Sequence, residues 1–83
     1  MADAPLLIEL AGVVRLAAKL PPETVVGGDS RLVEDLGIDS LDLVGLSLRV
    51  EEHFDVEIDA DAVPGFLRLR DVADYLALRR GAA

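Results

Sequence analysis

The spacing of apolar residues constrains the fold of this chain more than any other feature of its sequence. In the first stretch, about residues 4–19, the apolar face consists of Leu6, Leu10, Val13, Ala17 and Leu20, and it is widened by Leu7 and Val14. Spacing of this kind, every three to four positions, is typical of a helix that buries one side. No segment alternates apolar and polar residues for long enough to support a sheet. The sequence therefore predicts an all-α fold.

Two further helices are expected from the same spacing. One runs from residue 40 to 53 or 54 and begins after Asp39, a good N-cap residue, and the other runs from about 70 to 80. Between them, residues 59–63 can make one helical turn at most, because Pro64 follows. The expected architecture is a four-helix bundle with a short third helix.

A long connection, residues 21–38, separates the first two helices. Connections of this length are uncommon in small domains unless they serve a purpose. The apolar residues that can anchor it to the core are Val25, Val26, Leu32, Val33, Leu36 and Ile38. Ser30 or Asp29 can cap a single helical turn, and Gly37 is expected to adopt a positive φ. We therefore expect a long first loop that is pinned to the core.

Length and composition indicate one domain, residues 1–83, and exclude several kinds of site. The chain has 83 residues, of which 52% are apolar, enough for one small core. The absence of cysteine excludes a disulfide framework, a cysteine-ligated zinc site and a cysteine nucleophile, and it favours the cytoplasm. Residues 1–5 lack the positive charge of a secretory signal, and no apolar run reaches the ~18 residues of a membrane span.

Acidic residues outnumber basic ones by 16 to 8, for a net charge of −8. Nucleic acid is an unsuitable partner for such a chain, because binding it requires a basic surface. An acidic surface suits basic protein partners instead. We expect a monomer that meets other proteins.

The helix after residue 40 carries two apolar stripes on opposite sides. The inner stripe consists of Leu43, Leu46, Val50 and Phe54. The outer stripe consists of Leu41, Val44 and Leu48. A small bundle seldom buries two opposed stripes of one helix. The outer stripe therefore either packs beneath the long loop or forms an exposed patch, rimmed by acidic residues, that docks partner proteins.

Ser40 stands at the start of this helix, where a serine is most often only a cap. The one histidine, His53, lies thirteen residues further along, roughly 20 Å away at 1.5 Å per residue, so the two cannot form a catalytic pair. The paired carboxylates, such as Glu34 and Asp35, are read as solvated surface, because no loop has calcium-ligand spacing. We expect no metal site and no enzyme.

The residues around Ser40 carry a resemblance. The run LVEDLGIDSLD from Leu32 to Asp42 resembles the phosphopantetheine attachment motif of acyl carrier proteins. The likeness continues through EEHFDVEI at residues 51–58 and DYL at residues 74–76, and it covers roughly residues 5–79. The resemblance implies that a phosphopantetheinyl transferase attaches 4′-phosphopantetheine from coenzyme A to Ser40, with Asp39 and Leu41 assisting. The thiol of that arm then holds an acyl group as a thioester.

The resemblance also implies roles for the helix that begins at Ser40. Its docking surface for an acyl-loading enzyme, a ketosynthase or other tailoring enzymes comprises Leu41, Asp42, Val44, Gly45, Leu48, Glu51 and Glu52. The acyl chain is sheltered beside this helix, and the candidate lining residues are Ile38, Leu46, Val50, Ile58, Val63 and Phe66. Plain membership of the core is the alternative for each lining residue.

Four residues depart from the pattern of fatty-acid carriers. Gly45 replaces an acidic docking residue, Arg49 adds a positive charge, Pro64 shortens the third helix, and Arg68 replaces a capping hydroxyl. These departures favour a free-standing carrier for polyketide or related antibiotic biosynthesis. A fatty-acid carrier and an aminoacyl carrier stay open as alternatives. A non-covalent helical interaction domain, with Ser40 only a cap, is the alternative of another class.

Overall fold

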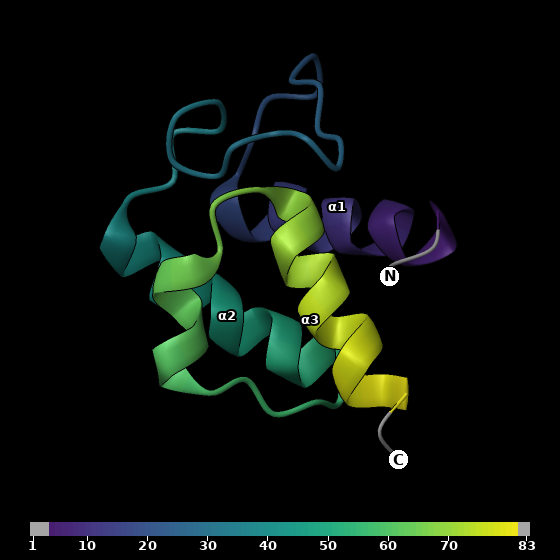
Figure 1. Cartoon of the computed structure of the whole chain (residues 1–83). Helices are drawn as coiled ribbons and strands as arrows, with labels where there is room; N and C mark the ends of the chain where they lie inside the picture. Colours follow the sequence, from purple (N-terminus) through teal and green to yellow (C-terminus); the bar gives the residue numbers. More distant parts are fainter. Residues whose placement is uncertain (1–3, 82–83) are drawn as a thin grey trace.

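Three α-helices and one short 3₁₀ helix form the fold in the computed structural model, which describes residues 4–81 (Figure 1). In chain order they are α1 (Ala4–Ala18), α2 (Ser40–Phe54), η1 (Ala60–Gly65) and α3 (Leu69–Gly81). Within these residues the strand-like pairing is limited to one isolated antiparallel bridge, between Arg31 and Arg68. The all-α, four-helix prediction is confirmed.

Helix α1 packs against both α2 and α3, while η1 packs against α2. The long loop arches over one end of the bundle, at the top of Figure 1, where α3 also begins. The largest fully buried side chains are Leu10, Val14, Leu32, Val50, Leu69 and Leu76. They come from all three α-helices and from the loop, so a single core joins the loop to the bundle.

Helix α1 differs from the sequence prediction in the residue at which it ends and in which of two neighbouring valines of the apolar face is fully buried. Val14 is buried beside Leu10, whereas Val13 is only half-buried. The helix ends at Ala18, and Lys19 then adopts a left-handed conformation with φ 54°. The N–H of Leu20 donates to the carbonyl of Arg15 at 3.1 Å, as at many helix C-termini. The helix is therefore already closed before the two prolines are reached.

The long loop is held mainly by its backbone. The N–H of Leu32 donates to the carbonyl of Leu67 at 2.9 Å, and that of Leu69 donates to the carbonyl of Ser30 at 3.0 Å. Leu32, Leu36 and Ile38 are buried, as expected, and Gly37 has the expected positive φ of 70°. The pinning of the loop to the core is confirmed.

Two details of the loop were wrong in the sequence prediction. Val25 and Val33 are exposed and anchor nothing, because these positions of the irregular backbone face solvent. The turn after Ser30 is capped by Asp35, whose Oδ2 accepts from the N–H of Arg31 at 2.8 Å. Ser30 instead accepts from Gly27 at 2.9 Å, since the preceding Gly-Gly segment turns back toward it.

The third helix is longer than the single turn predicted. The helix η1 spans six residues and includes Pro64. At three residues per turn, six residues make two 3₁₀ turns. Helix α3 begins one residue earlier than expected, at Leu69. Arg68 has no capping hydroxyl, but the helix start is held from the other direction, because Oδ2 of Asp71 accepts from the N–H of Arg68 at 2.8 Å. This contact is half of a capping box, so the departure at Arg68 leaves the helix start intact.

Candidate functional site

Ser40 is the first residue of α2, and the chain before it is shaped to present it. Gly37 turns the backbone, Ile38 buries its side chain, and Asp39 is extended with φ −79° and ψ 175°. Oδ1 of Asp39 accepts from the N–H of Asp42 at 2.8 Å, which confirms the predicted N-cap. Ser40 itself is exposed, and among residues 4–81 its hydroxyl has no hydrogen-bond partner. The hydroxyl is therefore not consumed as a cap and is accessible to a modifying enzyme.

A groove of about 410 Å³ begins at Ser40 and lies between α2 and η1. The α2 residues that line it are Ser40, Leu43, Val44, Ser47, Leu48 and Glu51. Their spacing of three, four, seven, eight and eleven positions from Ser40 places them along one side of the helix. The opposite wall consists of Ile58, Ala60, Val63 and Pro64.

The six candidate lining residues are not brought together. Ile58 and Val63 line the groove beside Ser40. Ile38 and Leu46 border a different hollow, on the α1 side of α2. Val50 is buried in the core, and Phe66 packs edge-on against Tyr75 with ring centroids 5.5 Å apart. The groove residues that the sequence did not reveal include Leu43, Ser47 and Pro64. The seven-residue spacing from Ser40, two helical turns, is a signal that could have pointed to Ser47.

The groove has two polar groups besides Ser40. Ser47 is only 8% exposed, and its hydroxyl donates to the carbonyl of Leu43 at 3.0 Å. Oε2 of Glu51 accepts from the N–H of Ile58 at 2.7 Å, and this hydrogen bond joins α2 to the first residue of the opposite groove wall. Both residues therefore line the groove while they are held by hydrogen bonds within the protein.

The outer stripe is exposed, which excludes the interpretation that it packs beneath the long loop. Leu41 is 82% exposed, Val44 52% and Leu48 55%, so the long loop does not cover them. Val44 and Leu48 border the groove, whereas Leu41 borders the hollow on the α1 side. The outer stripe is therefore an apolar ridge between two depressions.

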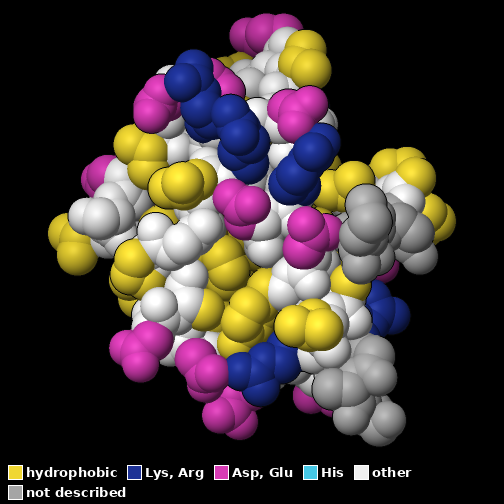
Figure 2. Space-filling model, in the orientation of Figure 1, with side chains coloured by type: hydrophobic (Ala, Val, Ile, Leu, Met, Phe, Trp, Pro, Cys, Tyr) yellow, Lys and Arg dark blue, Asp and Glu magenta, His cyan; other side chains and the backbone are white. Residues whose placement is uncertain are grey.

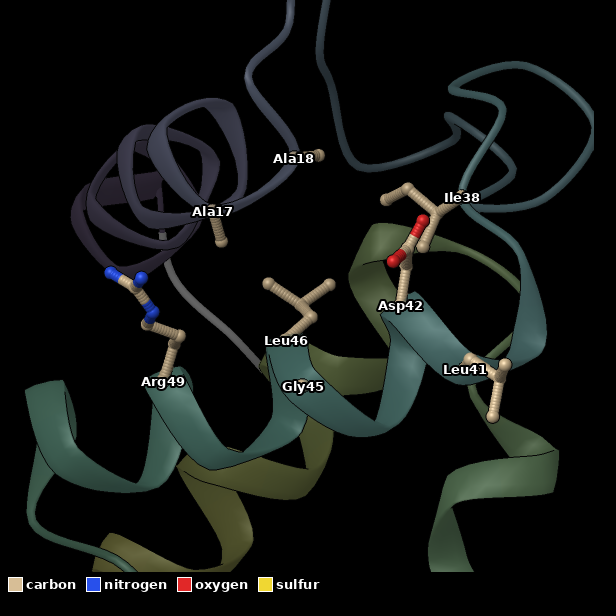
Figure 3. Close-up of a pocket in the computed structure, with 8 residues that line it drawn as sticks. All are labelled: Ala17, Ala18, Ile38, Leu41, Asp42, Gly45, Leu46 and Arg49. Carbon is tan, nitrogen blue, oxygen red and sulfur yellow. The ribbon is translucent and has the colours of Figure 1, made fainter.

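The hollow on the α1 side has a volume of about 220 Å³ (Figure 3). Ala17 of α1 points toward Leu46 of α2 across it, Ala18 lines the same hollow, and Asp42 and Arg49 stand on α2 on either side of Gly45. A Cβ atom built at Gly45 would meet nothing within 4 Å. The fold therefore does not require glycine at this position.

Charged residues are distributed unevenly between the loop and α2. Figure 2 shows Lys and Arg side chains gathered near the top of one face, over the loop and the start of α3. Several are paired there: Arg70 with Asp29 at 2.7 Å, and Arg31 with Glu34 and Asp35. Two hydrogen bonds from Arg31 hold the pKa of Asp35 below its usual value. The one from the backbone N–H has the larger effect, followed by the one from the side chain. Asp42 and Glu52 are exposed on α2 as candidate docking acids, whereas Glu51 is half-buried beside the groove.

His53 lies at the far end of α2, where its Nε2 is 2.8 Å from Oε2 of Glu9. It ties α2 to α1 and has no contact with Ser40. Across residues 4–81, no group of three or more His, Cys, Asp or Glu side chains is arranged to hold a metal ion. In the same part of the chain, every helix is too short or too polar to cross a membrane.

Comparison with known proteins gives consistent matches. Residues 9–76 match the family model described as "Phosphopantetheine attachment site". The chain is 44% identical over 54 residues to the acyl carrier protein of Campylobacter lari, covering 65% of this chain and 70% of that protein. It is 40% identical over 58 residues to the acyl carrier protein of Syntrophobacter fumaroxidans, covering 70% and 72% respectively.

Proposed function

The chain belongs to the acyl carrier protein family, whose members have a phosphopantetheine attachment site, and we propose that Ser40 is the attachment residue of this chain. The observation that supports this assignment is the exposed, unpartnered hydroxyl of Ser40 at the head of α2, directly beside an apolar groove. A carrier of this kind is a substrate of other enzymes and not a catalyst.

The surroundings of Ser40 fit a phosphopantetheine group. A phosphodiester on Oγ would lie at the N-terminus of α2, where the helix dipole favours negative charge. When bound, the group supplies a thiol that forms thioesters, which this chain, with no cysteine, does not provide itself. Asp39 holds the backbone that presents Ser40, and Leu41 projects from the next position as an apolar contact for the transferase.

Partner enzymes are proposed to dock on the ridge formed by the outer stripe. The exposed apolar residues Leu41, Val44 and Leu48 lie next to Ser40 on the same helix, and Asp42 and Glu52 add negative charge near them. Basic surfaces of a phosphopantetheinyl transferase, an acyl-loading enzyme or a ketosynthase complement this arrangement. The cytoplasmic location and the monomeric state stay predictions.

The pathway proposed is polyketide or related natural-product biosynthesis. Two residues support it: Gly45, which lines a hollow where the resemblance implies an acidic docking residue, and Arg49, which adds a positive charge to the same helix. A role in fatty-acid synthesis is equally consistent with the relatives, which are described only as acyl carrier proteins. An aminoacyl cargo is the third possibility.

The attachment site is tested by intact mass spectrometry after incubation with coenzyme A and a broad-specificity phosphopantetheinyl transferase. The wild-type chain should gain the mass of one phosphopantetheine, and Ser40→Ala should gain none. The matched controls are Ser30→Ala and Ser47→Ala, which remove the other two serines and should be modified like the wild type. Modification of Ser40→Ala would overturn the assignment to Ser40, and a wild-type chain that gains no mass would favour a non-covalent role.

A further inference from the structure

Ser47 is unusual within residues 4–81, because it is the one polar residue classed as buried. Although it is buried, Ser47 lines the groove that begins at Ser40. The two serines are seven residues apart on α2, about 10.5 Å along the helix axis at 1.5 Å per residue. A hydroxyl is therefore present inside an otherwise mostly apolar groove.

The hydrogen-bond capacity of Ser47 is only partly used. A serine hydroxyl has one hydrogen to donate and two lone pairs that accept. The Ser47 hydroxyl donates this hydrogen to the carbonyl oxygen of Leu43, with 3.0 Å between the two oxygen atoms. The described residues supply no donor to the lone pairs of Oγ. Ser47 thus offers the groove an acceptor and no donor.

Glu51 adds a second acceptor one turn further along the same side of α2. Its Oε2 is engaged by the N–H of Ile58 at 2.7 Å, while no partner is found for Oε1 within residues 4–81. Ser40 would also lose its hydrogen once its Oγ forms a phosphodiester. The side chains that line the groove then present acceptors alone.

We infer that the groove selects cargo that bears a hydrogen-bond donor, a hydroxyl or an amino group, over a saturated acyl chain of equal length, with Ser47 as the specificity-determining residue. This inference rests on the proposed function of Ser40. A saturated chain would displace water from the Ser47 oxygen and replace none of its hydrogen bonds, which is unfavourable. A keto group would bring only another acceptor and gain nothing.

The experiment uses the full chain loaded with eight-carbon acyl groups on the phosphopantetheine arm. One group is saturated, others carry a hydroxyl at successive positions, one carries a keto group, and one carries an amino group. The readouts are the melting temperature of each loaded form relative to the form with the unloaded arm, and the amide chemical shifts of residues 43–51. Both are measured in the wild type, Ser47→Ala and Ser47→Thr.

The expected result is a coupling between cargo and Ser47. At one hydroxyl position at least, the wild type should be stabilised beyond the saturated form by roughly 4–8 °C, the shift that one net hydrogen bond produces in a domain of this size. Ser47→Ala should remove that excess, and Ser47→Thr, which keeps a hydroxyl, should retain it. The saturated and keto forms should be stabilised and not weakened by Ser47→Ala, because the variant removes the oxygen that these chains leave without a donor.

The variant Glu51→Gln distinguishes a hydroxyl on the cargo from an amino group. It keeps an oxygen that accepts from the N–H of Ile58 but removes the carboxylate charge. An amino cargo should lose stabilisation in this variant, whereas a hydroxyl cargo should not. If the arm attaches to Ser40 but no donor-bearing cargo is coupled to Ser47, this inference is overturned and the carrier assignment stands. If the arm does not attach to Ser40, the proposed function fails first, and the inference falls with it.

Discussion

The two sides of α2 are built from nearly the same side chains, but one side is buried and the other is exposed. On the inner stripe, Leu46 is 5% exposed and Val50 1%, while on the outer stripe Leu48 is 55% exposed and Val44 52%. Leucine and valine occur on both, so chemistry does not distinguish them. The inner stripe faces α1 and the core, and the outer stripe faces solvent between two depressions.

The difference shows that apolar residues in one helix can serve stability and recognition separately. Burying a leucine contributes about 1.5–3 kcal/mol to folding, so an exposed leucine leaves that free energy unused in the free protein. Apolar residues that stay exposed next to an accessible attachment residue gain burial only when a partner covers them. Substitutions of matched residues on the two sides of α2 should therefore have different effects.

The largest effect is expected on stability. Leu46→Ala should lower the free energy of unfolding by about 2–5 kcal/mol, because it leaves a cavity in the core. Leu48→Ala, two positions away, should change it by about 0.5 kcal/mol or less, because the side chain is already half in water. Urea denaturation followed by circular dichroism measures both. Equal losses would show that the outer stripe is structurally buried.

The converse effect is expected on recognition. Leu41→Ala should lower kcat/KM for the phosphopantetheinyl transferase by about tenfold, equivalent to about 1.4 kcal/mol, if Leu41 is an apolar anchor of the interface. The matched control is Leu78→Ala on α3, because Leu78 is 74% exposed and Leu41 82%. The control should leave kcat/KM unchanged. A similar loss in both variants would point to a general effect of surface change and not to docking.

A smaller, severalfold effect is expected from charge. Raising the salt concentration from about 0.1 M to about 1 M shortens the Debye length from about 10 Å to about 3 Å, so kcat/KM should fall while kcat changes little. Glu52→Gln on α2 should flatten this dependence more than Glu23→Gln in the long loop, although both remove one charge. If the two variants have the same salt dependence, the encounter is guided by net charge alone.

The smallest effect concerns glycine. Gly45→Ala and Gly12→Ala should each raise the free energy of unfolding by about 0.5–1 kcal/mol, because both glycines lie within helices and an added Cβ meets nothing within 4 Å. Only Gly45→Ala should slow loading by pathway enzymes, since Gly45 lines the hollow beside Leu41. Gly45→Glu should raise exchange with fatty-acid elongation enzymes. Identical kinetics for the two alanine variants would remove the functional meaning of this glycine.

Most of the local structure could be predicted from the sequence. The helix spacing, the Asp39 cap and the positive φ of Gly37 depend on neighbouring residues, and the structure confirms them. The prediction for η1 was short by one turn, because the 3₁₀ geometry that accommodates Pro64 was not considered. Val25 and Val33 were misplaced because an irregular loop has no period from which burial can be read.

The helices, the presentation of Ser40 and the resemblance that led to the family all depend on residues close together in the chain, so they could be inferred before the fold was known. Which stripe of α2 is covered could not be inferred in this way, because two equally apolar stripes differ only in what packs against them in the folded chain. The tertiary structure also decided that Ile58 and Val63 face the groove while Val50 and Phe66 do not. Ser47 became visible as a groove residue in the same way, because a groove forms where separate segments, here α2 and η1, leave space between them.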